Sequence, residues 1–212
     1  MIFQDRLDAG RRLATACLPY REAWQGTVVL GIPRGGVPVA APVAEALGVP
    51  LDVILVRKLG LPRNEEVAMG AIGEGVRVLD QTLIRVMGVT DEQLARVEQR
   101  ERAELERRVH RYREGRHPVE LRGTTAVVVD DGLATGATAR AACAVARAHG
   151  AASVVLAVPV APPDWQPRPG VDADAVVCVA RPPGFFAIGQ WYRDFTQTTD
   201  AEVRKLLGLP ND

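Results

Sequence analysis

Asp130 and Asp131 stand side by side at the end of an apolar run in VVVDDGLATGAT, residues 127–138. Like charges this close repel each other unless a ligand or a cation engages both. Carboxylates accept hydrogen bonds, so the vicinal diol of a ribose is a suitable ligand. The loop that follows consists of Ala134, Thr135, Gly136, Ala137 and Thr138. Its backbone N–H groups, at the start of a predicted helix, are suited to a phosphate, and its threonines add hydroxyl donors.

Diol and phosphate together indicate a ribose 5-phosphate. The alternative is an ordinary strand–helix turn in which an aspartate caps the helix. That turn accounts for one carboxylate and one threonine, but not for the acid pair together with TGAT. The chain has no GK[ST] loop and no GxGxxG after a predicted strand, which excludes the P-loop and the dinucleotide-binding motif.

Two further motifs follow apolar runs. In GIPRGG, residues 31–36, Gly35 and Gly36 permit close backbone approach to an anion, and Arg34 adds a cationic fork. A plain glycine-rich turn is the alternative. Arg57 and Lys58 end the next run, where a charge at a strand end is often only solvated. Because adjacent strand residues point to opposite faces, we expect one of them to reach the ligand, with Lys58 favoured.

Short apolar runs alternating with alanine-rich helical segments predict an α/β fold with a parallel sheet. The strands are expected at 27–33, 51–59, 76–80, 124–131, 153–161 and 175–181, and the helices at 5–18, 37–48, about 90–115, 137–150 and 201–208. The Gly-rich segment 61–75 is expected to be a mobile loop followed by short strand pieces. Thr90 and Gln93 fit a capping box at the start of the long charged helix. The loops after parallel strands meet at one edge of the sheet, where such folds bind ligands.

VVVDDGLATGAT resembles the phosphoribosyl-pyrophosphate (PRPP) signature of type I phosphoribosyltransferases. The resemblance implies a parallel sheet flanked by helices, with a helical insertion and a small C-terminal hood. It assigns Asp130 and Asp131 to the ribose hydroxyls and residues 134–138 to the 5-phosphate. It assigns Arg34, Gly35 and Gly36 to the loop that binds pyrophosphate. In this family that loop often contains a strained or cis peptide. The division expected is one domain, 1–212, with a core at 24–80 and 120–181, an insertion at 81–119, and a hood at 1–20 and 182–212.

The same resemblance places a flexible catalytic loop at 61–75. There Arg63 is expected to close on the phosphates, and Glu65 or Glu66 to contact the substrate; a solvent-exposed hairpin is an equal alternative. The aromatic tail is the expected hood, in which Phe185, Phe186, Trp191 or Tyr192 would stack on a base. For each of these rings, packing against the sheet is at least as strong an expectation.

The reaction implied is displacement at ribose C1 of PRPP by a nitrogen nucleophile, with pyrophosphate leaving and a nucleobase-like small molecule accepting. Catalysis would rest on Arg34, Lys58, Asp130 and Asp131. Mg²⁺ would be held mostly by pyrophosphate and water, with Asp130 and Asp131 acting through water. Ala134 departs from the hypoxanthine/guanine branch, where an acid opens the phosphate loop, and this leaves the general base unassigned. DRxDAGRRLA and GQWYxDFTQT make the whole chain look like a bacterial group of predicted phosphoribosyltransferases of undefined acceptor.

Composition restricts the other readings. Lys+Arg and Asp+Glu are both 26, which argues against nucleic-acid binding by bulk charge. The three cysteines have no zinc-site spacing, and neither a secretory signal nor a run of about 20 apolar residues is present, so a cytoplasmic protein is expected. Three rivals stay open: a non-catalytic PRPP- or nucleotide-binding regulator, a hydrolase or phosphorylase acting on another phosphorylated ribose, and a nucleic-acid regulator using the arginine-rich helix. A homodimer is expected from the resemblance alone.

Overall fold

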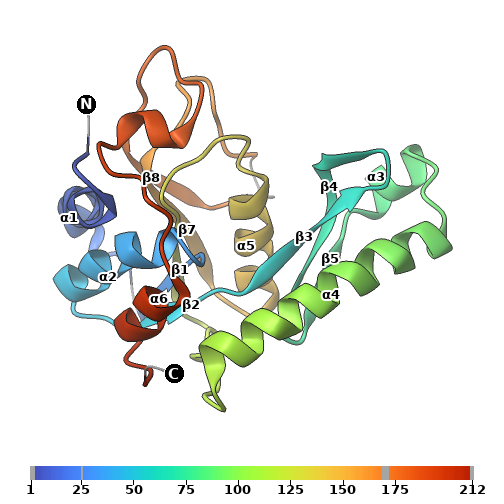
Figure 1. Ribbon diagram of the computed structural model, residues 1–212, viewed down its shortest axis with the longest axis horizontal. Coiled ribbons are helices and arrows are strands. Elements are labelled where there is room, and N and C mark those ends of the chain that lie inside the picture. Colours follow the sequence, from blue (N-terminus) through green and yellow to red (C-terminus); the bar gives the residue numbers. More distant parts are fainter. Residues whose placement is uncertain (1–2, 25, 169–171, 211–212) are drawn as a thin grey trace.

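A five-stranded parallel sheet forms the body of the molecule. The computed structural model describes residues 3–24, 26–168 and 172–210 (Figure 1). The sheet has the order β2-β1-β6-β7-β8, and every neighbouring pair is parallel. Its strands are β1 (Val28–Gly31), β2 (Leu51–Val53), β6 (Thr125–Val129), β7 (Ser153–Val160) and β8 (Ala175–Ala180). The predicted parallel α/β sheet is therefore confirmed.

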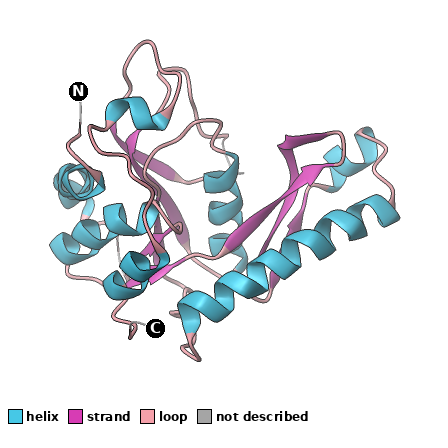
Figure 2. Ribbon diagram, in the orientation of Figure 1, coloured by secondary structure: helices cyan, strands magenta, loops and turns pink. Residues whose placement is uncertain are grey.

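Helices cover both faces of this sheet (Figure 2). Helices α1 (Arg6–Cys17) and α2 (Gly36–Leu47) pack on one face, and α5 (Ala137–Ala148) packs on the other. Successive side chains of β6 alternate between the two layers: Val127 and Val129 join the core with α1 and α2, whereas Ala126 and Val128 join the core with α5. A strand buried on both faces explains the continuous apolar run that ends at Asp130.

A second, antiparallel sheet projects from the body together with the long helix α4 (Figure 1). We call residues 56–113 the arm. It contains β3 (Val56–Leu61), β4 (Asn64–Gly73), β5 (Val76–Leu79), α3 (Gln81–Val86) and α4 (Asp91–Arg113). Leu59, Met69 and Leu105 lie in a core between α4 and one face of this sheet. The capping box of Thr90 and Gln93 is confirmed.

Two sequence predictions are wrong here. The strand expected at 51–59 is interrupted after Val53: β2 belongs to the parallel sheet, and the chain resumes at Val56 as the first strand of the arm. The mobile loop with short strand pieces expected at 61–75 is instead the ten-residue strand β4, which forms an antiparallel hairpin with β3, the alternative given for this segment. The strand expected at 76–80 is confirmed as β5, which pairs with β4 in the arm. Glycines are typical of loops, and this led to the wrong prediction. In the structure Gly70 lies within β4 because its neighbour is close: an added Cβ would lie 2.5 Å from the Val78 carbonyl oxygen. The division into core, insertion and hood stays a prediction.

The base of the arm is fixed to the body by a buried ion cluster. Arg113, at the end of α4, donates to Asp52 of β2 (Nη1–Oδ1, 2.6 Å) and to Glu74 (Nη2–Oε2, 2.7 Å). It also donates to the carbonyl of Val53 at 3.1 Å. Asp52 in turn accepts from the backbone of Val119. Each of the three charged groups thereby has a partner of opposite charge, which a buried guanidinium requires.

The first described residues pair with the C-terminal aromatic tail beside β8. The backbone N–H of Phe3 donates to the Trp191 carbonyl at 2.7 Å, and that of Arg193 donates to the Phe3 carbonyl at 2.8 Å. Phe3 is fully buried. Three shorter segments complete the fold: η1 (Leu18–Tyr20), η2 (Ile188–Trp191) and α6 (Asp200–Leu206). Among the helices described, none has the length and hydropathy needed to cross a bilayer.

Candidate functional site

The acid pair lies at the carboxyl end of β6, in the centre of the sheet edge. Asp130 Oδ1 accepts from the backbone N–H of Asp131 at 2.9 Å. Asp131 Oδ2 accepts from Arg6 Nε at 2.8 Å, and Arg6 also donates to the Thr196 carbonyl. Burial and the neighbouring Asp131 raise the pKa of Asp130 well above its usual value. Burial raises the pKa of Asp131 too, but the Arg6 guanidinium opposes that rise.

The two carboxyls therefore differ in their surroundings. Asp131 has a cationic partner, whereas Asp130 has none among the contacts described. Sequence reasoning missed Arg6, whose signal was its place in DRxDAGRRLA.

The glycine-rich loop after β1 packs directly against this pair. A Cβ on Gly35 would lie 2.0 Å from Asp131 Oδ2, and one on Gly36 would lie 2.5 Å from the Val129 carbonyl oxygen. Only glycine allows this approach at both positions. The Pro33–Arg34 peptide bond is cis, as the resemblance implied. Two motifs remote in sequence thus form one continuous surface.

The segment 134–138 forms a turn that leads into α5. Thr135 and Thr138 are exposed, and the backbone N–H of Ala137 donates to Thr135 Oγ1 at 3.3 Å. Gly136 has a φ of +76°, which favours glycine. An exposed turn with hydroxyls at a helix start is the arrangement expected of a phosphate loop.

Two residues that were not predicted from the sequence contact this turn and support it. Arg140 donates to the Thr135 carbonyl at 3.0 Å and to Asp172 at 3.1 Å. The buried indole of Trp165 lies under Gly136, where an added Cβ would be 2.5 Å from its Nε1. Arg140 and Trp165 sit in an ordinary helix and a proline-rich turn, so no motif marks them.

Arg57 and Lys58 face opposite sides of the arm, as the strand alternation predicted. Arg57 pairs with the buried Glu101 of α4 (Nη2–Oε2, 2.6 Å), whereas Lys58 pairs with Glu66 (Nζ–Oε1, 3.1 Å). Both residues line a cavity of about 270 Å³, together with Thr138 of the segment 134–138. Because the Glu66 side chain is 70 % exposed, the Lys58 pair is weak and the ammonium is easily released to a ligand.

Arg63 is not brought to this cavity by the structure. It lies in the exposed turn between β3 and β4, at the outer end of the arm (Figure 1). Glu65 pairs with Arg100 of α4 at 3.0 Å. A role for Arg63 or Glu65 would therefore require the arm to move, and it stays a prediction.

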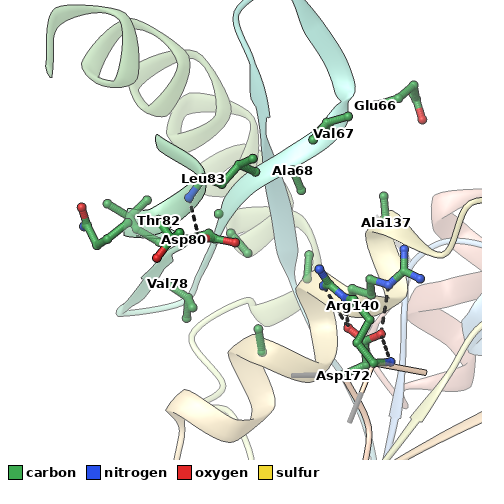
Figure 3. A pocket seen from close by; sticks show the side chains of 17 residues that line it. Glu66, Val67, Ala68, Val78, Asp80, Thr82, Leu83, Ala137, Arg140 and Asp172 are labelled. Atoms are coloured by element: carbon green, nitrogen blue, oxygen red, sulfur yellow. Dashed lines mark hydrogen bonds and ion pairs between the residues drawn. The ribbon is translucent and has the colours of Figure 1, made fainter. Parts of the chain in front are cut away.

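A larger cavity of about 760 Å³ separates the arm from α5. Figure 3 shows Glu66, Val67 and Ala68 on the arm's side, and Ala137 and Arg140 of α5 across the gap. Ala137 begins α5, and Arg140 donates to the carbonyl of Thr135. The cavity-lining face of the arm is therefore opposite the segment 134–138, for which phosphate binding is predicted.

The four rings of the aromatic tail differ in exposure. Tyr192 is 6 % exposed, packs beside Phe3 and Phe195, and donates from its hydroxyl to the Asp131 carbonyl at 2.6 Å. Tyr192 is therefore packed, which is the alternative given for these rings, and its hydroxyl supports the backbone of the acid pair. Trp191 is half-buried against Phe185. Phe186 is 91 % exposed and remains available.

The family model for the phosphoribosyl transferase domain matches residues 2–190. The chain belongs to this family. It is 55 % identical over 203 residues to a Mycobacterium tuberculosis H37Rv protein named "Putative phosphoribosyl transferase Rv0571c", covering 95 % of this chain and 45 % of that protein. The chain thus spans about half the length of the curated relatives it matches.

Solved structures share the fold. TT1426 from Thermus thermophilus superposes with a TM-score of 0.88 at 44 % identity, over 98 % of each chain. A Neisseria gonorrhoeae protein solved with bound ppGpp has a TM-score of 0.51 at 15 % identity, over 98 % of this chain and 95 % of that one. The second likeness concerns the fold alone. The type I phosphoribosyltransferase-like fold predicted from the sequence is confirmed.

Proposed function

We propose that this phosphoribosyltransferase-family chain binds PRPP with Mg²⁺ and transfers its 5-phosphoribosyl group to a nitrogenous, nucleobase-like acceptor, releasing pyrophosphate. One observation carries the proposal: Gly35 lies so close to Asp131 that the acid pair and the Arg34–Gly36 loop form a single surface. The phosphate loop lies at the same sheet edge, so the three groups of PRPP have adjacent partners.

Each part of PRPP has a residue suited to it. Asp130 and Asp131 accept hydrogen bonds from the ribose hydroxyls, and the N–H groups and hydroxyls of 134–138 hold the 5-phosphate. As the C1–oxygen bond breaks, its electron pair leaves with pyrophosphate while the acceptor nitrogen bonds to C1. Arg34 and Lys58 stabilise the negative charge that develops on the leaving group. Catalysis here rests on positioning and electrostatics.

The residues present fit a metal ion held mainly by the substrate. No cluster of three or more His, Cys, Asp or Glu that could hold a metal occurs within 3–24, 26–168 and 172–210. Asp130 and Asp131 offer hard oxygen ligands that suit Mg²⁺ through water, with pyrophosphate supplying the remaining oxygens. When bound, Mg²⁺ would neutralise part of the pyrophosphate charge.

A non-catalytic PRPP- or nucleotide-binding regulator is the second candidate. The observation that favours it is the exposed Ala134, where the hypoxanthine/guanine branch has an acid. With alanine there, the loop holds a phosphate but offers no side-chain base. The two candidates share the binding step and differ in the transfer.

Calorimetric titration with PRPP and Mg²⁺ tests the shared step. We expect saturable binding by the wild type and loss of binding in Asp130→Asn with Asp131→Asn. Absence of binding, or equal binding by that variant, would contradict the proposal. A pyrophosphate-release screen across free bases then separates enzyme from regulator, because only transfer releases pyrophosphate in an acceptor-dependent way. The homodimer and the cytoplasmic location stay predictions; light scattering would test the first.

A further inference from the structure

A polar cavity of about 460 Å³ is lined by the glycine-rich loop, by α4 and by the segment that leads into α6. Its charged lining consists of Arg6, Arg34, Arg108, Arg111, Glu104 and Asp200. Four guanidiniums against two carboxylates leave an excess of two positive charges. Gly35 and Pro33 of the loop also line it. A cavity of this composition is suited to an anion that carries more than one charge.

Arg108 connects this cavity with the smaller one at Lys58. It lines both the 460 Å³ and the 270 Å³ cavities, as Pro33 does. Its side chain is 33 % exposed and donates through Nε to Glu104 at 3.0 Å. Glu104 also pairs with Arg107, so one carboxylate serves two guanidiniums. A guanidinium has five N–H donors, which leaves Arg108 with donors directed toward a ligand.

The carboxylate of Asp200, at the start of α6, lies among the arginines of this cavity. Its carboxylate accepts from Arg111 and from the hydroxyl of Tyr112, and lies 3.9 Å from Arg34 Nη1. Burial and this carboxylate raise the pKa of Tyr112, so the phenol stays a donor at neutral pH. Donors from the glycine-rich loop and from α4 thus converge on one carboxylate.

We propose that Arg108 and Arg111 of α4 bind the pyrophosphate group of PRPP together with Arg34, and that Asp200 competes with pyrophosphate for these donors. The inference rests on the proposed function and extends the pyrophosphate site to a helix outside the three motifs. Figure 1 shows the C-terminal end of α4 beside α6, which places competitor and donors on neighbouring elements. These residues act through hydrogen bonds and charge, and no covalent bond to them forms or breaks.

The test measures binding of Mg²⁺-pyrophosphate and of Mg²⁺-PRPP by calorimetry. Arg108→Gln and Arg111→Gln should each weaken binding by about 10-fold or more, the effect of losing a charge-assisted hydrogen bond. Arg107→Gln is the matched control: it shares Glu104 with Arg108, is 75 % exposed and does not line either cavity. It should leave binding within about twofold of wild type, as expected for a surface charge.

Asp200→Asn supplies a readout of opposite sign. Removing the competing charge should tighten pyrophosphate binding by about 3- to 10-fold, a modest charge effect. A purely structural role for Asp200 would give weaker binding instead. Circular dichroism would establish that each variant is folded. If Arg111→Gln does not fold, Asp200→Asn still decides the test.

Wild-type-like binding by both arginine variants, or weaker binding by Asp200→Asn, would overturn the inference while leaving PRPP binding intact. Failure of the wild type to bind PRPP would overturn the proposed function, which is a separate result.

Discussion

The two adjacent aspartates are expected to differ in their effects on stability, because among the contacts described Asp131 has an ion pair with Arg6 and Asp130 has none. Asp131 is paired with Arg6, whereas burial and Asp131 raise the pKa of Asp130. A carboxyl with a raised pKa in the folded chain contributes stability below its unfolded pKa, and that contribution is lost as pH rises through its folded pKa. At neutral pH the charge on Asp130 is therefore a cost of the fold.

Asp130→Asn should raise the free energy of unfolding at pH 7, because it removes the buried charge, by about 1 kcal/mol, a common size for the effect of one substitution. The gain should disappear below about pH 4, where the wild-type carboxyl is protonated in both states. Urea denaturation at the two pH values measures this, and the same variant should lose PRPP binding. A gain that is equal at both pH values would contradict the explanation.

Asp131→Asn is the matched control and should not give the same gain. It removes a buried charge, but it also replaces the ion pair with Arg6 by a hydrogen bond to a neutral amide oxygen. At pH 7 we expect this variant to be less stable than Asp130→Asn by about 1 kcal/mol or more, because hydrogen bonds between charged groups are the stronger ones. Equal effects from both asparagine variants would show that the two carboxyls share one environment.

The space at position 35 allows no side chain larger than that of glycine. In Gly35→Ala the new methyl group would lie 2.0 Å from Asp131 Oδ2, so either the loop or the acid pair must shift. We expect a destabilisation of about 1–3 kcal/mol, typical of overpacking. Pyrophosphate binding should fall with it, because the loop and the acids move together. Thermal unfolding and calorimetry on one preparation would compare the two losses; unchanged stability would contradict the close packing.

At the scale of elements, the arm depends on the ion cluster at its base. Arg113→Gln would leave Asp52 and Glu74 without their guanidinium in a buried setting. Breaking a buried pair in this way costs about 3–5 kcal/mol. Urea denaturation followed by circular dichroism measures the loss. Arg116→Gln, an exposed arginine that donates to the Leu207 carbonyl, is the control and should change stability little.

The sequence predicted those elements whose signals are local. The start of α4 was visible because Thr90 and Gln93 cap it within one turn, and the body strands were visible as short apolar runs. The change of sheet between Val53 and Val56 was not, since LDVILVRKL is almost uniformly apolar up to Arg57. An apolar run shows that a strand is buried but not which strand pairs with it.

The candidate site divides in the same way. Asp130, Asp131 and the two loops lie in contiguous motifs, so their residue types alone indicated a ligand. Arg6, Arg108 and Tyr192 reach the site from an N-terminal helix, the arm and the C-terminal tail. The motifs DRxDAGRRLA and GQWYxDFTQT mark the segments that contain Arg6 and Tyr192, but the contacts of all three residues follow from tertiary packing, and no motif marks Arg108.

At the scale of the molecule, the parallel sheet separates two cores, and each contains a buried cysteine. Cys17 lies in the core with α1 and α2, and Cys143 in the core with α5. Burial raises the pKa of each thiol to about 12. At pH 8 the thiolate that reacts with disulfide reagents is therefore almost absent while the fold is closed.

We expect Cys17 and Cys143 to be labelled at the same slow rate, set by unfolding of the whole body. Two variants that retain Cys17 or Cys143 alone, with the half-buried Cys178 and the other cysteine replaced by alanine, measure the two rates separately when treated with a disulfide reagent in increasing urea. The shared strands make the layers open together. Much faster labelling of one cysteine would show instead that its layer opens independently.

The passage of one extended segment, Leu51–Leu61, from the body into the arm has a further consequence. Side chains alternate along a strand, so Arg57 faces α4 and Lys58 faces the other side. The register of β3 is set by its pairing with β4 and by the apolar side chains that face α4, because Ile54 and Leu55 lie between the two strands. We therefore expect an added or deleted residue at Ile54–Leu55 to leave Arg57 toward Glu101 and to change instead the position of the whole arm relative to β2.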